Sequence, residues 1–217
     1  MLKADLHIHT SYSFDCRSSL DEVIASCLKH GIDCVAIADH ATAEGGLKLK
    51  LKAPFHVIVA EEILTPSGEI MGMFLKETIP SPNSVDETIA RIRDQGGLVC
   101  IPHPFDLLRP SAFRMNDLLP IMSNIDVIEV FNARSIAPGT TSKSWVLAKK
   151  YGKAASAGSD AHTPEEIGSA YVEMPEFTGR DDFLKSLSQG KIHGKRAGLT
   201  VHFASTVAKL LKHTPQE

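Results

Sequence analysis

The sequence predicts a single domain of the α/β class, and three observations support this. The chain has 217 residues, of which 43% are hydrophobic and 23% charged, as is typical of one globular domain with a sizeable core. Short apolar runs rich in β-branched residues alternate with longer amphipathic segments. No internal repeat, low-complexity tract or long linker interrupts this alternation, which is the pattern of an α/β fold.

The apolar runs are expected to be buried parallel strands, because strands covered on both faces read as continuous apolar sequence. Before them comes Asp5-Leu6-His7-Ile8-His9, where apolar and polar residues alternate as in a strand. The expected buried strands span residues 34–38, 57–60, 70–75, 98–101 and 127–131.

The amphipathic segments between these runs are expected to be helices. They cover residues 19–30, 84–95 and 141–151 and are followed by Gly31, Gly96-Gly97 and Gly152, as helix C-termini often are. Lys48, Lys50 and Lys52 alternate with leucines, which indicates an exposed face of a helix or an edge segment.

One boundary is plausible near the C-terminus, in the glycine- and lysine-containing stretch 190–198. We therefore expect a barrel domain over residues 1–195 and a short extension over 196–217. Residues 201–213 are expected to form a basic helix that packs on the domain or makes a subunit contact.

Charge and cysteine content restrict the function. The formal net charge of −3 gives no overall basic field for non-specific nucleic-acid binding, so a small molecule is the expected partner. The four cysteines are scattered and are expected to be reduced, buried thiols. No segment approaches the roughly 20 apolar residues of a membrane span, and the expected location is the cytoplasm.

Residues of metal-binding types occur where the predicted strands end. His7 and His9 project to one face of their strand, so they can chelate one ion. Asp15 follows a few residues later. The strand 34–38 is followed directly by Asp39 and His40. Each of these residues alone has an ordinary explanation as a cap, loop or strand-face residue.

The later strands repeat the pattern. Strand 57–60 runs into Glu61-Glu62, with Glu69 shortly after, and His103 lies between two prolines. A further apolar run ends in Asp160 and His162. In parallel barrels the C-terminal strand ends converge on the active site. Nitrogen and oxygen donors without thiolates favour two to three divalent ions such as Mn, Zn or Fe, with Mg also suitable.

The order of these motifs resembles the polymerase and histidinol phosphatase (PHP) superfamily over nearly the whole chain. The resemblance implies a distorted seven-stranded (β/α) barrel with a trinuclear metal centre and metal-dependent phosphoesterase activity. The segments that carry it are Asp5-Leu6-His7-Ile8-His9-Thr10, Asp39-His40, Glu62, His103-Pro104 and Gly158-Ser159-Asp160-Ala161-His162.

The resemblance also implies roles for individual residues. It assigns the first ion to His7, His9, Glu62 and Asp160, the second to Glu62 as a bridge and His103, and the third to Asp15, His40 and His162. Many members have a histidine where this chain has Glu69, a change that favours harder ions such as Mn over Zn.

Several further residues are candidates for supporting roles. Arg134 follows the strand 127–131 and is expected at the metal rim as a phosphate-binding residue, with Arg109 a second candidate. Asp5 and Asp39, each near a ligand histidine in sequence, could orient imidazoles; the competing interpretation is strand or helix capping.

The expected reaction is hydrolysis of a small phosphate ester, most simply a nucleotide or the end of an oligonucleotide, by metal-activated water. Three alternatives stay open at this stage. They are a histidinol-phosphate phosphatase, a metal-dependent amidohydrolase, and a non-enzymatic module that binds metal or nucleotide.

Overall fold

The computed structural model describes residues 1–80, 83–106 and 108–196 and has one curled sheet. Its nine strands are arranged in the order β7-β6-β5-β4-β3-β2-β1-β8-β9. The strands are β1 (Leu2–Ile8), β2 (Cys34–Ile37), β3 (His56–Thr65), β4 (Gly68–Met73), β5 (Leu98–Ile101), β6 (Val127–Asn132), β7 (Ala154–Gly158), β8 (Ala170–Met174) and β9 (Lys191–Gly194).

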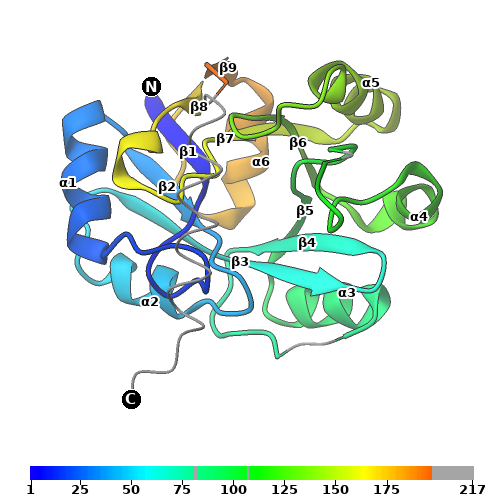
Figure 1. The fold of residues 1–217 in the computed structure, drawn as a ribbon, viewed down its shortest axis with the longest axis horizontal. Coiled ribbons are helices and arrows are strands. Elements are labelled where there is room, and N and C mark those ends of the chain that lie inside the picture. Colours follow the sequence, from blue (N-terminus) through cyan, green and yellow to red (C-terminus); the bar gives the residue numbers. More distant parts are fainter. Residues whose placement is uncertain (81–82, 107, 197–217) are drawn as a thin grey trace.

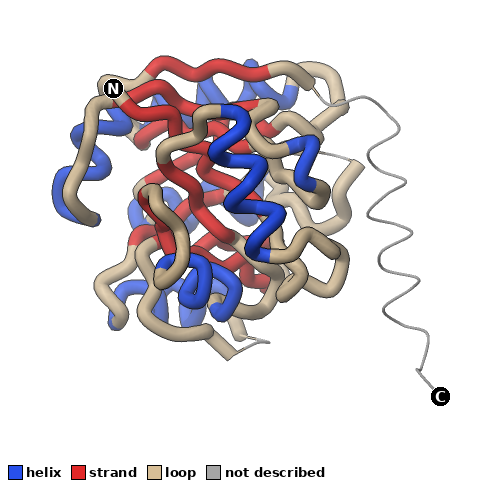
Figure 2. Tube along the Cα trace, turned by 90° about the vertical axis from the view of Figure 1, so that its left-hand side faces the viewer, coloured by secondary structure: helices blue, strands red, loops and turns tan. Residues whose placement is uncertain are grey.

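Helices lie outside the strands, and α1, α2, α3 and α5 form the outer margin of the molecule in Figure 1. Figure 2 shows the same arrangement from the side, with strands enclosed among helices and loops. The helical elements are α1 (Leu20–His30), α2 (Glu44–Lys50), α3 (Val85–Asp94), α4 (Met115–Leu118), η1 (Leu119–Asn124), α5 (Thr140–Tyr151), η2 (Pro164–Glu166) and α6 (Arg180–Ser188).

The three predicted helices form, and their ends follow from their sequences. Ser19 and Ser84 begin α1 and α3 with capping boxes, in which the serine side chain accepts from a backbone amide one turn later. Gly31 and Gly152 end α1 and α5 in the left-handed conformation that glycine adopts most easily. None of the helices in the described part of the chain is long and apolar enough to cross a membrane.

The sheet closes almost completely into a barrel. Strands β1, β2 and β3 are parallel to one another, as are β5, β6 and β7. The end of β7 returns to the end of β1, where Asp160 N donates to His7 O at 2.8 Å and His9 N donates to Ala161 O at 2.9 Å. The expected distorted α/β barrel is thereby confirmed.

Strand β4 corrects one expectation about direction. Residues 70–75 were expected to form a parallel strand, but β4 is antiparallel to both β3 and β5. The physical reason is the short Thr65–Gly68 hairpin, which can join only antiparallel neighbours. Strands β8 and β9, which continue the sheet beyond β1, were not anticipated.

A close approach of backbones explains Gly158 at the barrel seam. A Cβ atom on Gly158 would lie 2.3 Å from the Cβ of His7 and 2.7 Å from its backbone nitrogen. Only glycine therefore lets β7 pack this tightly against β1.

An irregularity in β1 turns the histidines toward the barrel interior. The register between β1 and β2 shifts between Asp5 and Ile8. Leu6 packs with the interior residues of β2 and β3, whereas Ile8 packs with Val23 of α1 outside the barrel. A β-bulge of this kind re-aims side chains. It brings His7 to the interior and leaves Asp5 on the outer face.

The predicted C-terminal helix over residues 201–213 lies outside the described residues, as does all of the expected extension except Arg196. The described chain ends just after β9, whose residues lie within the stretch considered as a boundary. All four cysteines are free and buried, as expected.

Candidate metal centre

The nine predicted ligand side chains meet at one end of the barrel. All are buried except His40, whose side chain is 16% exposed. They come from the ends of β1, β2, β3, β5 and β7, from the start of β4 and from the loop after β1. The set consists of His7, His9, Asp15, His40, Glu62, Glu69, His103, Asp160 and His162.

The first predicted ligand group surrounds the facing imidazoles of β1. His7 Nε2 and His9 Nε2 are 3.1 Å apart, and each lies 3.5 Å from Glu62 Oε2. Asp160 Oδ1 completes the group at 3.3 Å from His9 Nε2 and 3.8 Å from His7 Nε2. Four donor atoms therefore face a common point.

Glu62 also belongs to the second group, as expected of a bridging carboxylate. Its Oε1 lies 2.8 Å from His103 Nε2, and its Oε2 lies 3.4 Å from His40 Nδ1. Glu69 lies 3.7 Å from His103 Nε2 and 3.8 Å from His40 Nδ1. The carboxylate that replaces the family's histidine is thus within reach of the same space.

The third group lies on the opposite side of His9. Asp15 Oδ2 is 3.4 Å from His40 Nε2 and 3.2 Å from His162 Nε2. The rings of His9 and His162 are 4.3 Å apart between centroids. These four residues offer donor atoms that all lie within 4.8 Å of one another.

Two of the ligands have strained backbones. His103, between Pro102 and Pro104, has φ of 29°, and Asp160 has φ of 56°. Non-glycine residues with positive φ are uncommon, and such strain gathers at active and ligand sites. His103 comes two residues after the end of β5, and Asp160 comes two residues after the end of β7. The turn at each residue directs its side chain toward the other ligands.

Glu129 is a functional residue that the sequence analysis missed. It lies in the middle of β6 and faces the barrel interior, where its Oε1 accepts from His7 Nδ1 at 3.1 Å. Its Oε2 accepts from the backbone nitrogen of His103 at 2.7 Å and from Asn132 Nδ2 at 3.0 Å. The available signal was a charged residue inside an otherwise apolar strand.

The neighbouring carboxylates Asp5 and Asp39 do not orient imidazoles. Asp5 accepts from the backbone nitrogens of Ser159 and Gly168, both at 2.9 Å, and Asp39 accepts from the backbone and hydroxyl of Thr10 at 2.6 and 2.7 Å. Both lie on the outer face, Asp39 because it directly precedes His40 and Asp5 because of the bulge in β1. Their role is to fix the backbone, as in the capping interpretation.

The two candidate arginines both lie beside Asp160. Arg109 Nη2 contacts the Asp160 carboxylate directly, and its side chain is 23% exposed. Arg134 is buried, with Nη1 3.5 Å from Asp160 O and Nε 3.6 Å from Glu166 Oε1. Arg109, the second candidate from sequence, is therefore the more exposed of the two.

Burial and neighbouring charges shift the pKa values of the ligands in both directions. Burial alone would raise the pKa of Glu62, but the surrounding imidazoles, His7 first among them, hold it well below its usual value. Burial lowers the pKa of His9 to about 3, which keeps its imidazole neutral. The pKa of His7 is raised despite burial, chiefly by Glu129, so a metal ion must displace a proton there.

The donor set fits divalent cations. Glu62 Oε2 and Asp160 Oδ1 are buried without a hydrogen-bond partner among the residues that the structure describes. Buried electron pairs without partners are costly. A cation among them removes that cost, and nitrogen and oxygen donors suit hard or borderline divalent ions.

Comparisons with known proteins match two segments of the chain to family models. Residues 5–80 match the PHP domain model, and residues 141–192 match a PHP-associated model. The uncharacterized protein MJ0417 of Methanocaldococcus jannaschii is 36% identical over 179 residues, covering 81% of this chain and 72% of the relative.

Solved structures share the fold. A two-domain protein from Bacteroides vulgatus containing a predicted PHP-like metal-dependent phosphoesterase aligns with a TM-score of 0.72 and 14% identity, covering 95% of this chain and 69% of that one. An amidohydrolase from Chromobacterium violaceum aligns with a TM-score of 0.62 and 17% identity, covering 76% of this chain and 89% of that one.

Proposed function

Since this chain belongs to the PHP family, we propose that it is a metal-dependent phosphoesterase that hydrolyses a small phosphate ester, either a nucleotide or the end of an oligonucleotide. The observation that carries the proposal is the meeting of three donor groups on Glu62, which contacts His7, His9, His40 and His103. The nine donor side chains of the three groups together exceed what one ion can use.

The ligand groups assign places to two or three ions. His7, His9 and Asp160 with Glu62 form the first, His103 and Glu69 with Glu62 the second, and Asp15, His40 and His162 the third. When bound, divalent ions neutralise charge on phosphoryl oxygens and make water more acidic.

The protein itself supplies orientation and charge. Glu129 holds the proton of His7 on Nδ1, which turns the lone pair of Nε2 toward the donor cluster. Arg109 and Arg134 place guanidinium groups beside Asp160, where a planar fork can bind two phosphoryl oxygens. Metal binding at Asp160 competes with Arg109 for the same carboxylate, which leaves the Arg109 guanidinium available to substrate.

The substrate proposal depends on the absence of an added domain. No domain is inserted between the strands in the ranges that the structure describes. Nucleotides and oligonucleotide ends are small or narrow enough to reach the ligand cluster. Mn is the preferred ion, because Glu69 adds a carboxylate to the second group.

A substrate panel tests the proposal. Full-length protein reconstituted separately with Mn, Zn, Fe and Mg is assayed against nucleotides, short oligonucleotides, sugar phosphates, histidinol phosphate and a chromogenic amide. We expect metal-dependent release of phosphate or nucleotide, highest with Mn and with nucleotide substrates. Turnover of the amide alone contradicts the proposal in favour of an amidohydrolase, and nucleotide binding without any turnover favours a binding module.

A further inference from the structure

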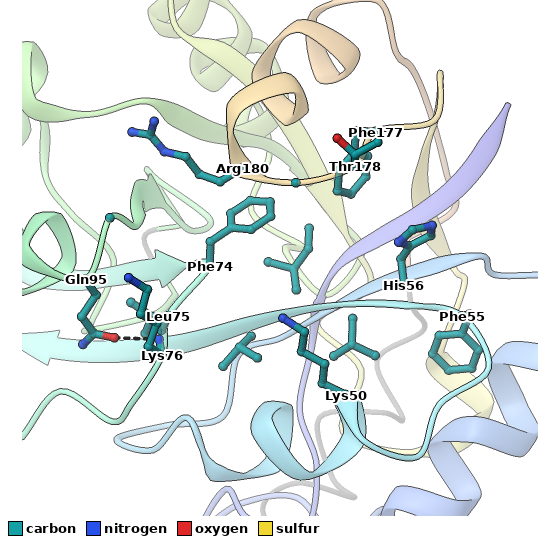
Figure 3. A pocket seen from close by; sticks show the side chains of 15 residues that line it. Lys50, Phe55, His56, Phe74, Leu75, Lys76, Gln95, Phe177, Thr178 and Arg180 are labelled. Atoms are coloured by element: carbon teal, nitrogen blue, oxygen red, sulfur yellow. Dashed lines mark hydrogen bonds between the residues drawn. The ribbon is translucent and has the colours of Figure 1, made fainter.

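A cavity separate from the candidate metal centre lies at the opposite end of the barrel. Its volume is about 580 Å³, within the range of small-molecule sites. It is formed by the start of β3 at His56, the segment after β4 and the segment between β8 and α6 (Figure 3). His56 begins β3 and Glu62 lies six residues further along the same strand, so the length of β3 between them separates this cavity from the metal ligands.

The inner wall of the cavity is aromatic. Phe55, Phe74 and Phe177 line it, and the rings of Phe74 and Phe177 meet edge to face with centroids 6.4 Å apart. Phe74 has φ of 61°, which is an unusual backbone for a bulky side chain. Strain of this kind gathers at ligand sites, as it does at His103 and Asp160 in the metal cluster.

The rim of the cavity is cationic. Lys50, Lys76 and Arg180 line it together with His56, and no aspartate or glutamate belongs to the lining. Figure 3 shows Lys50 and Arg180 on different sides of the cavity, and they belong to separate elements, α2 and α6. Lys50 and Lys76 have no ion pair among the residues described, although the whole chain carries a net charge of −3.

Arg180 has one competing partner, Asp181, whose oxygen lies 3.1 Å from Arg180 Nη1. That pair is solvent-exposed, with side chains 45% and 95% accessible, and such pairs are worth little. A ligand anion can therefore displace it. The wall behind Lys76 is fixed, because Gln95 Oε1 accepts from the backbone nitrogens of Lys76 and Glu77 at 2.8 and 3.1 Å.

From this combination we propose that the cavity is a second ligand site, which binds a nucleoside phosphate without hydrolysing it. The phenylalanine rings offer an apolar surface on which a base can stack, and the cations bind its phosphates. The cavity contains none of the predicted metal ligands, so the bound molecule is not placed for hydrolysis. The proposal does not depend on the activity proposed for the metal cluster.

Calorimetric titration tests this site on the full-length, metal-reconstituted chain. The probe is α,β-methylene adenosine diphosphate, which resists hydrolysis. In Lys50→Glu/Arg180→Glu, we expect binding at the cavity to weaken at least tenfold, while turnover of a chromogenic phosphate ester stays at the parent level. Lys52→Glu is the matched control, because Lys52 is an exposed neighbour outside the cavity lining.

A second probe separates the two parts of the site. Methylenediphosphonate carries the phosphate charge without the base, so it should bind more weakly than the nucleotide by at least tenfold. Binding that is equal in the parent and the double variant would overturn the proposal, since the probe would then occupy the metal end alone. Absence of saturable binding, or equal affinity for both probes, would overturn it too.

Discussion

Glu62 is the residue on which the candidate centre depends most. Its two oxygens contact imidazoles from the ends of three strands, β1, β2 and β5. Its neighbour Glu61 points to the outer face and accepts from the backbone nitrogen of Ile79 at 2.8 Å. Strand alternation alone predicts that only one of the pair reaches the interior, and the residue expected there was Glu62.

Replacement of each glutamate in turn tests this distinction. Glu62→Gln should abolish turnover and reduce bound metal, because a neutral amide is a poor bridge between ions. Glu61→Gln should retain most activity, since the Glu61 carboxylate accepts a hydrogen bond from the backbone nitrogen of Ile79 and faces away from the donor cluster. Metal content by elemental analysis and kcat on the best substrate decide the matter. The reverse result would mean that the wrong glutamate has been assigned to the centre.

Arg134 provides a second test at the scale of a single residue. If its guanidinium binds the phosphoryl group, Arg134→Lys should lower kcat/KM by roughly tenfold, the effect of losing one charge-assisted hydrogen bond. Metal content should not change, because lysine keeps the positive charge beside Asp160 and Arg134 is not one of the nine donor side chains. Steady-state kinetics equal to those of the parent would restrict Arg134 to a structural role.

The strands show where sequence patterns are informative and where they are not. Hydrophobicity located β2, β3, β5 and β6, because burial on both faces requires apolar residues. It could not give the direction of β4, since the same apolar residues suit either orientation. No sequence signal indicated the bulge in β1, which puts Asp5 and His7 on opposite faces, so the suggestion that Asp5 orients an imidazole was wrong. Glu129 was missed because its partners come from β1 and β5, which are distant in sequence.

The seam between β1 and β7 gives a prediction for these two elements. Gly158→Ala should reduce metal affinity and lower the melting temperature, because the new methyl group would overlap the backbone of His7. Overpacking of this type typically costs about 1–3 kcal/mol. Gly179→Ala is the control, because a Cβ there meets nothing within 4 Å. Equal effects of the two substitutions on metal content would contradict the close packing at the seam.

At the scale of the whole molecule, the donor cluster links metal content to stability. Buried donors without partners destabilise the folded chain, and ions that bind only the folded state stabilise it. The centre draws its ligands from residues 7 to 162, which includes most of the described chain. Its formation therefore requires the complete barrel.

Metal removal should accordingly lower the melting temperature of the protein. At free metal 100 times the dissociation constant, one bound ion contributes about 2.7 kcal/mol to the free energy of unfolding. Reconstituted protein should hold more than one equivalent of divalent metal by elemental analysis. Dialysis against a chelator should reduce the metal content and the melting temperature together. A stoichiometry that never exceeds one would contradict the trinuclear arrangement.

The narrow seam of the barrel has a consequence for how the protein opens. His7 and His9 lie on one side of the seam and Asp160 lies on the other, so an ion held by all three would cross-link two distant parts of the chain. An ion that binds only the folded chain opposes the separation of β1 from β7 by its binding free energy, about 2.7 kcal/mol at free metal 100 times the dissociation constant. Amide hydrogen exchange in β7 should then be slow with metal and fast without it, while exchange in β2, which is hydrogen-bonded on both sides, changes less.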